Sequence, residues 1–144
     1  MTHKKQIDDR FERFGVKSFT AVSKVNNFVD RLESGNVSGT KCKTCGLVFF
    51  PPRADCCQCL SEEMEWFDIK GAGRLISFSM LKYAPAGFEA DTPYAVALVD
   101  FKTCKVFGRI TKDISEENLK IGMQMTVAVR RLENDKITYE FHHP

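Results

Sequence analysis

Alternating apolar and polar residues over the second half of the chain predict β-strands. Ile76, Phe78 and Met80 point to one side of the first segment and two serines to the other. The five predicted strands cover residues 76–80, 94–101, 105–110, 123–129 and 137–141. A short helical turn, acidic at its start, is predicted at residues 115–119, between the third and fourth strands. This order favours a small closed barrel of the OB type.

The chain before this region divides into two predicted parts. Residues 1–39 form a tail and an amphipathic helix, because apolar residues recur every three to four positions from Phe19 to Leu32. Ser18 is the expected N-cap, and Gly35 lies where a helix end favours positive φ. Residues 40–70 are too short to build an apolar core and need a metal or covalent bonds to hold them. The predicted barrel occupies residues 71–144.

The composition is typical of an ordinary folded protein. Of 144 residues, 43% are hydrophobic and 28% are charged, which argues against disorder. The longest apolar run, at residues 94–99, is far shorter than the roughly 18 residues that a membrane span needs. The first residues lack the apolar region of a secretory signal peptide. We therefore expect a cytoplasmic protein that does not bind membranes.

The charge distribution makes nucleic acid an improbable partner. Residues 1–60 hold ten basic and six acidic side chains, giving +4, whereas residues 61–144 hold eleven and thirteen, giving −2. A barrel that follows a phosphate backbone would be the more basic half. A single-stranded nucleic-acid-binding module, in which zinc ribbons and OB folds both occur, therefore stays the second hypothesis.

Five of the six cysteines lie within 18 residues and predict a metal site. Cys42 and Cys45 form one C-x2-C pair, and Cys56 and Cys59 form another after ten intervening residues. Each pair can present two sulfurs from one tight turn, and four thiolates complete the tetrahedral shell of a structural Zn²⁺. Using Cys57 instead would give a strained C-x-C pair, so we expect a free thiol there. Iron held as in rubredoxin is the alternative metal.

Catalytic motifs do not accompany this site. A four-cysteine shell leaves no position for a reacting water, so the metal is expected to hold the fold. The chain has no nucleophile elbow, P-loop or dinucleotide fingerprint, and we predict no catalytic residue. Cys104 is expected to be a small buried apolar residue. Arginines beside the strands, such as Arg109 and Arg130, are expected to be solvated, with phosphate contact as the alternative.

Several of these residues together resemble the DUF35 family. The similarity is carried by the two cysteine pairs, by residues 49–53 between them, and by Trp66 with the Gly71-Ala72-Gly73 segment. The family has an N-terminal helix, a rubredoxin-like zinc ribbon and an OB fold, and it accompanies thiolase-fold enzymes. The resemblance extends over residues 18–142. Where this chain has Cys57, a proline is more usual.

The resemblance implies a non-catalytic accessory subunit of a thiolase, acyltransferase or aldolase complex that acts on acyl-CoA. The expected partner is a thiolase-fold catalytic subunit, and the expected ligand of the complex is a CoA thioester near the barrel. Zinc would be the structural cofactor, held by Cys42, Cys45, Cys56 and Cys59. The residues that the resemblance assigns to the contact with the partner are Phe49, Phe50, Pro51, Pro52 and Arg53. CoA-contacting residues cannot be assigned in this way.

Overall fold

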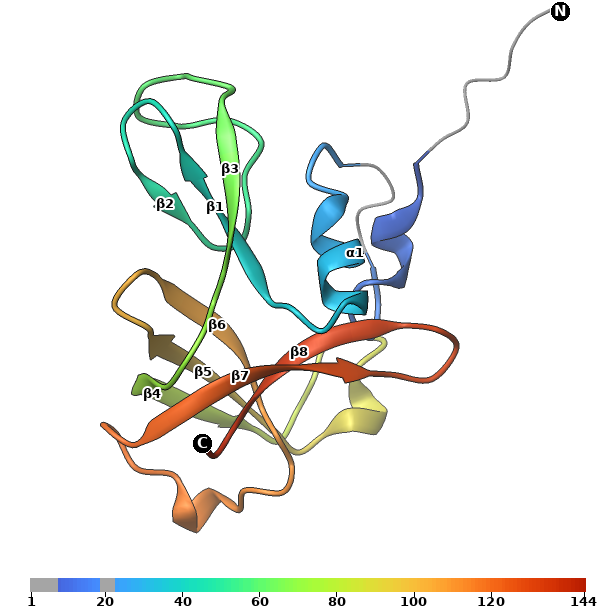
Figure 1. Cartoon of the computed structure of the whole chain (residues 1–144). Coiled ribbons are helices and arrows are strands. Elements are labelled where there is room, and N and C mark those ends of the chain that lie inside the picture. Colours follow the sequence, from blue (N-terminus) through green and yellow to red (C-terminus); the bar gives the residue numbers. More distant parts are fainter. Residues whose placement is uncertain (1–7, 19–22) are drawn as a thin grey trace, which may run out of the picture.

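Two β-sheets form the framework of the protein (Figure 1). The computed structural model describes residues 8–18 and 23–144. The smaller sheet has the strand order β2-β1-β3, and the larger is a closed barrel with the order β4-β5-β6-β8-β7. The strands are β1 (Ser38–Cys42), β2 (Val48–Phe49), β3 (Met64–Asp68), β4 (Gly73–Leu81), β5 (Tyr94–Asp100), β6 (Lys105–Ile110), β7 (Gln124–Arg131) and β8 (Ile137–His142). This architecture confirms the predicted fold class.

All five predicted strands are present, and they correspond to β4, β5, β6, β7 and β8. Neighbouring strands run antiparallel except β6 and β8, which pair in parallel at Arg109–Glu140 and Ile110–Phe141. The predicted helical turn is a 3-10 helix, η3 (Glu116–Asn118), between β6 and β7. A second, η2 (Glu89–Asp91), lies between β4 and β5.

The alternation predicted for the first barrel strand is wrong at its start. A β-bulge shifts the register between Leu75 and Ser77. Because the bulge inserts one residue, Leu75 and not Ile76 faces the core, while Phe78 and Met80 pack against it as expected. Leu75 is completely buried.

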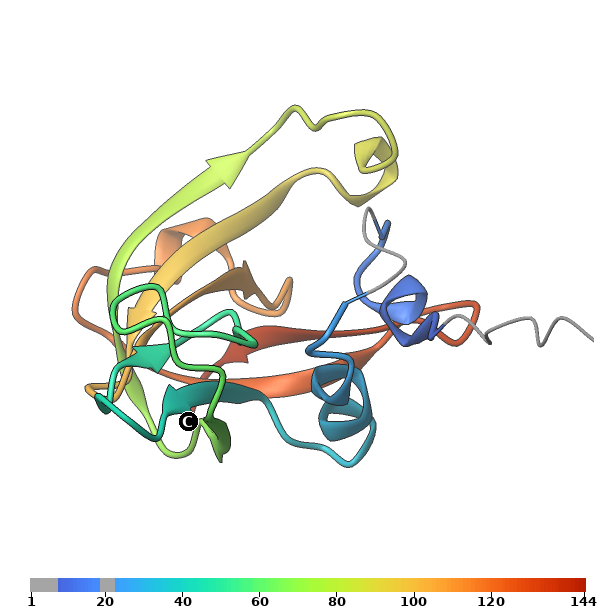
Figure 2. The same cartoon turned by 90° about the horizontal axis from the view of Figure 1, so that it is seen from above.

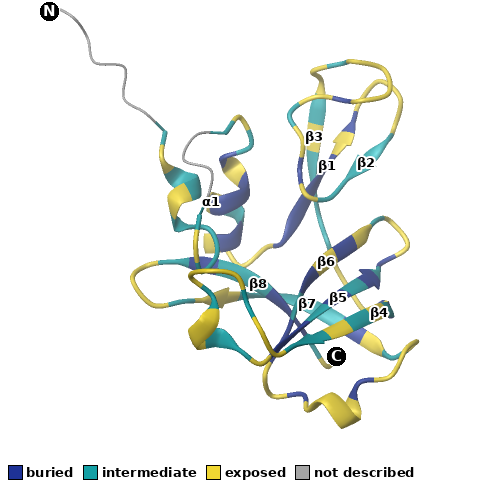
Figure 3. Ribbon diagram, turned by 180° about the vertical axis from the view of Figure 1, so that it is seen from behind, coloured by how far each residue is buried: buried dark blue, intermediate teal, exposed yellow. Residues whose placement is uncertain are grey.

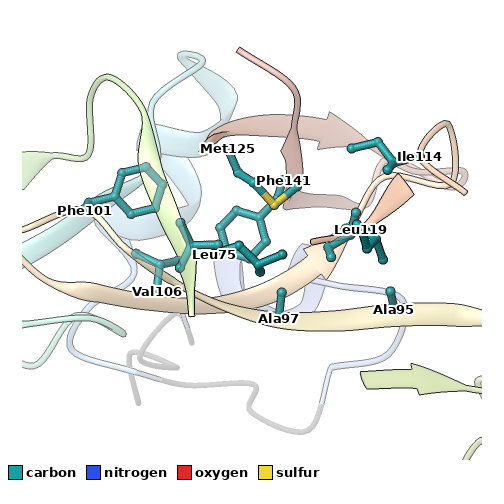
Figure 4. Packing of buried hydrophobic residues seen from close by; sticks show 11 residues of the cluster. Leu75, Ala95, Ala97, Phe101, Val106, Ile114, Leu119, Met125 and Phe141 are labelled. Atoms are coloured by element: carbon teal, nitrogen blue, oxygen red, sulfur yellow. The ribbon is translucent and has the colours of Figure 1, made fainter. Parts of the chain in front are cut away.

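The barrel interior is a single apolar cluster (Figure 4). Leu75, Val99, Val106, Met125 and Phe141 have no exposed surface, and Figure 4 shows Met125 and Phe141 side by side next to Leu75. Each such side chain contributes about 1.5–3 kcal/mol through burial. These residues come from β4 to β8, so the core holds the strands together before any ligand or metal is considered.

The helix is shorter than predicted. It is α1 (Asn27–Glu33), and Ser18 is not its N-cap, because Ser23 is non-helical and residues 24–26 form a turn. Residues 19–22 of the predicted face lie outside the described part of the chain. One face of α1 is buried, as the dark blue segment of Figure 3 shows, through Phe28, Val29 and Leu32.

The end of α1 agrees with the prediction. Gly35 has φ of 90°. Its N–H donates to the Leu32 carbonyl at 2.9 Å, and the N–H of Asn36 donates to the Arg31 carbonyl at 2.8 Å. This Schellman motif satisfies two carbonyls that would otherwise lack donors. No helix among residues 8–18 and 23–144 is long and apolar enough to cross a bilayer.

A second apolar cluster joins the helix, the small sheet and the β7–β8 hairpin. Phe28 and Ile137 are buried in it, and Phe50, Trp66 and Tyr139 pack against them. The rings of Phe28 and Phe50 are 6.2 Å apart, and those of Phe50 and Tyr139 are 5.5 Å apart. The small sheet is therefore fixed to the barrel through aromatic side chains.

Candidate metal centre and adjoining loop

The first cysteine pair lies in a tight turn after β1. The N–H of Cys42 bonds to the Leu47 carbonyl at 2.8 Å, and the N–H of Gly46 bonds to the Cys42 carbonyl at 2.9 Å. Gly46 has φ of 81°, a conformation that glycine adopts without steric cost. The turn brings the sulfur of Cys45 to the same side as that of Cys42.

The second cysteine pair lies in a turn with the same two backbone hydrogen bonds. The N–H of Cys56 bonds to the Ser61 carbonyl at 2.9 Å, and the N–H of Leu60 bonds to the Cys56 carbonyl at 3.0 Å. Leu60 occupies the position that Gly46 has in the first turn and adopts φ of 62°. Its side chain is 80% exposed. The two turns are thus equivalent in backbone geometry although their sequences differ.

The two turns bring four sulfurs together. The Sγ atoms of Cys42, Cys45, Cys56 and Cys59 all lie within 4.8 Å of one another, and the 42–59 and 45–56 pairs are 3.5 Å apart. Four sulfurs at about 2.3 Å from a tetrahedral Zn²⁺ are separated by about 3.8 Å. The cluster therefore has the donor type and the spacing of a closed zinc site.

Backbone N–H groups favour thiolates in this cluster. The N–H of Cys45, which points at the Cys42 sulfur over 3.5 Å, is the main cause that lowers the pKa of Cys42 to about 6. The N–H groups of Cys59 and Gln58 likewise lower the pKa of Cys56. A thiolate is the form that binds a metal ion.

The two remaining cysteines lie outside the cluster. Cys57 is exposed and is not among the four sulfurs that converge. Cys104 is half-buried against the barrel core, and burial raises the pKa of its thiol. The surroundings of Cys104 do not mark a nucleophile, since a reactive thiol needs a lowered pKa.

The loop between the cysteine pairs is anchored to β1. Thr40 is 1% exposed, and its Oγ1 accepts a 2.8 Å hydrogen bond from the N–H of Arg53 and donates one of 3.0 Å to the Arg53 carbonyl. The guanidinium of Arg53 lies 5.5 Å from the ring centre of Phe49. One buried hydroxyl thus fixes the course of the loop.

The five residues expected to contact a partner do not share one surface. Phe50 packs inward against Phe28 and Tyr139, and Pro52 is buried. Pro51 and Arg53 are exposed, and Phe49 is half-exposed. Pro51 and Arg53 therefore offer the most surface to another protein, while Phe49 and Phe50 are both partly exposed.

One barrel arginine differs from the expectation of a solvated side chain. The guanidinium of Arg109 lies 3.9 Å from the ring centre of Tyr94 and 5.6 Å from that of Phe88, and it pairs with Asp91 at 2.9 Å. No pattern in the sequence predicts this arrangement, because Asp91 and Phe88 lie between strands in a segment without periodicity. Arg130, which is exposed, pairs with the buried Glu140 at 2.8 Å.

Comparison with known proteins agrees with this geometry. Residues 29–65 match the rubredoxin-like zinc ribbon domain of ChsH2, and residues 66–130 match the ChsH2 C-terminal OB-fold domain. A DUF35 domain-containing scaffold protein of Methanocaldococcus jannaschii is 34% identical over 99 residues, which are 67% of this chain and 70% of that protein. The chain belongs to the DUF35 family. The predicted resemblance is confirmed.

Two further relatives of this DUF35 protein are informative. Benzoylsuccinyl-CoA thiolase subunit BbsA of Thauera aromatica is 28% identical over 109 residues, covering 73% of this chain and 74% of BbsA. A chain of the Ltp2-ChsH2(DUF35) aldolase structure superposes with a TM-score of 0.70, covering 85% of this chain and 96% of that one. At 22% identity, the second similarity concerns the fold alone.

Proposed function

We propose that this DUF35 protein is a non-catalytic, zinc-binding accessory subunit of a thiolase-type acyl-CoA enzyme, whether thiolase, acyltransferase or aldolase. It binds the catalytic subunit and helps to form the acyl-CoA site or channel. The observation that carries the proposal is the closed four-cysteine cluster in a chain related to scaffold proteins and to a thiolase subunit. Four protein thiolates leave no open coordination position, so the metal serves structure.

Zinc is proposed to be held by Cys42, Cys45, Cys56 and Cys59. When bound, it would supply the stability that the small sheet cannot obtain from apolar burial. The bonds between Thr40 and Arg53 then keep the loop at one position relative to the metal.

The proposed contact with the catalytic subunit uses Phe49, Pro51 and Arg53. Phe50 and Pro52 support them from below, because both are turned toward the interior. Aromatic and arginine side chains are enriched where protein interfaces are strongest. The remaining contact area is not assigned to particular residues.

The test is reconstitution with the co-purifying subunit. The tagged protein is isolated from its native extract, and proteins present in stoichiometric amount are identified by mass spectrometry. A thiolase-fold subunit is expected, and thiolysis of acetoacetyl-CoA or condensation by that purified subunit should rise when this chain is added back. The Arg53→Ala variant should need a higher concentration for the same rise, whereas Cys57→Ser should match the unchanged chain. A thiolase-fold subunit that is equally active with and without this chain would refute the accessory role.

A further inference from the structure

The outer face of the barrel has the parts of an OB-fold ligand groove. In OB folds, ligands lie on the second and third barrel strands, between the loop that joins strands 1 and 2 and the loop that joins strands 4 and 5. The corresponding strands here are β5 and β6. The corresponding loops are residues 82–93 and 132–136.

Residues 14–17, which we name the strap, lie between these two loops. The carbonyl of Val16 accepts a 2.9 Å hydrogen bond from Nζ of Lys136, and the N–H of Gly15 bonds to the Ile137 carbonyl at 2.8 Å. At the other side, a Cβ added to Gly87 would lie 2.8 Å from Cδ of Lys17, so the two segments touch. Figure 2 shows this blue segment between the yellow loop and the red tip of the β7–β8 hairpin.

The strap turns the groove into a pocket. A cleft of about 350 Å³ lies between the strap, the loop at residues 82–93 and the outer face of β5, β6 and β8. A volume of this size is at the lower end for small-molecule sites. A polymer that runs along the groove between the two loops would meet the strap, which argues against the nucleic-acid hypothesis.

The walls of this pocket are rich in aromatic rings. Phe14, Phe88, Tyr94, Phe107 and Tyr139 all line it. Phe107 is 59% exposed, so its ring lacks the cover that apolar side chains usually have. The hydroxyl of Tyr139 is already used by the Phe107 carbonyl, at 2.6 Å. The guanidinium of Arg109 covers Tyr94 and Phe88, and Phe14 stacks on Tyr139, so a planar apolar ligand would stack on the exposed ring of Phe107.

The charged residues of the pocket leave an excess of positive charge. Four basic side chains line it against two acidic ones, a balance of +2. The acids are committed, because Asp91 pairs with Arg109 at 2.9 Å and Glu140 with Arg130 at 2.8 Å. Lys17 lies close enough to Glu89 to help lower the pKa of that carboxyl, whereas Nζ of Lys112 donates a 2.6 Å hydrogen bond to the Asp91 carbonyl and pairs with neither carboxylate of the pocket. The pocket therefore attracts an anion.

We propose that this pocket binds a small planar aromatic molecule that carries a negative charge. The exposed ring of Phe107 supplies a stacking face, Lys112 supplies the charge, and the strap limits the length of the ligand. An aromatic acid and a nucleotide share this chemistry. The inference goes beyond the accessory role and does not depend on it, because the pocket is complete in one chain.

The experiment titrates the full-length zinc-loaded chain with 2-naphthoate and with adenosine 5′-monophosphate by calorimetry. Binding of either supports the proposal and distinguishes the two sources. Phe107→Ala should raise the dissociation constant about five- to tenfold, as expected for loss of a stacking face. This variant should fold, because the side chain is mostly exposed and the backbone carbonyl that Tyr139 uses remains. Tyr83→Ala, at a 92% exposed ring that does not line the pocket, is the matched control and should bind unchanged.

Two further probes test the chemistry of the ligand. Lys112→Ala should weaken 2-naphthoate binding about fivefold and leave the neutral 2-naphthol unaffected, since only the first has a charge to lose. Decanoate should bind more weakly than 2-naphthoate. The proposal is overturned if neither aromatic anion binds, if Phe107→Ala and Tyr83→Ala behave alike, or if decanoate is preferred. Competition by a twelve-residue oligothymidylate at physiological salt would instead assign the face to nucleic acid.

Discussion

The hydroxyl of Tyr139 donates a 2.6 Å hydrogen bond to the backbone carbonyl of Phe107. These residues belong to β8 and β6, which pair directly only at Arg109–Glu140 and Ile110–Phe141. Tyr139 thus connects the two strands beyond the point where their ladder ends. The side chain of Tyr139 therefore links β6 and β8 beyond their backbone pairing.

Tyr139→Phe should lower the free energy of unfolding by about 1 kcal/mol at neutral pH, the usual contribution of such a bond. Burial raises the pKa of Tyr139 above its ordinary value. The stabilisation is therefore fully present below about pH 10, where an unfolded tyrosine titrates, and is lost as the pH rises toward the folded-state pKa. Urea unfolding at pH 8 and at pH 10.5 should show the difference between variant and parent shrinking. Tyr83→Phe, at an exposed ring, should show neither effect.

Because the two turns of the metal centre are equivalent, we expect that introducing glycine at position 60 stabilises the protein and that removing glycine at position 46 destabilises it. Leu60→Gly should raise the free energy of unfolding by about 0.5–1 kcal/mol, because relief of the left-handed strain outweighs the greater chain entropy of glycine. Gly46→Leu should lower it by about 1–2 kcal/mol, although space for a side chain is open there. Thermal unfolding of the zinc-loaded proteins measures both. Leu60→Ala keeps the strain and should change little; a gain equal to that of Leu60→Gly would mean that the leucine side chain, not φ, is the cause.

The choice of metal ligands predicts a sharp difference between neighbouring cysteines. Cys42→Ser and Cys59→Ser should reduce zinc content well below one ion per chain and unfold the small sheet, because metal binding and folding of such a site are coupled. Cys57→Ser should keep one zinc, since Cys57 is exposed and is not one of the four clustered cysteines. Metal analysis by mass spectrometry, with amide spectra of β1 and β3, gives the readout. Equal loss in all three variants would contradict the ligand assignment.

The anchored loop gives a prediction about partner binding. Thr40→Val has nearly the same shape but leaves the N–H and carbonyl of Arg53 without their buried partner, which should cost about 1–3 kcal/mol. Affinity for the catalytic subunit should fall although no proposed contact residue is changed. Thr44→Val, at an exposed threonine whose hydroxyl bonds only to that of Ser61, is the control. An unchanged affinity for Thr40→Val would remove this loop from the interface.

The sequence was most informative where local spacing decides the structure. Two C-x2-C pairs can converge by geometry alone, and the alternation at residues 123–129 and 137–141 needs only one buried face. The turn at Asn134 and Asp135, both with φ of 58°, was likewise predictable.

Features that depend on contacts distant in sequence could not be predicted. The bulge after Leu75 interrupts the alternation without any Gly or Pro to mark it. Phe50 is expected at a contact surface, and its ring contacts with Phe28 and Tyr139, 22 positions before it and 89 after it, leave it only partly exposed. The strap has no periodic pattern, and its bonds to Lys136 and Ile137 join residues at least 120 positions apart.

The strap also bears on how the protein is made. Its bond from Val16 to Lys136 spans 120 residues, which a ribosome takes roughly 6 to 24 s to synthesise. The strap therefore leaves the ribosome early and cannot form its bond until Lys136 has been synthesised. Helix α1 and the metal turns can form from nearby residues. Pocket closure belongs to the last stage of maturation. Because β8 is also synthesised last, the barrel and the pocket close together, and a newly made chain lacks both until then.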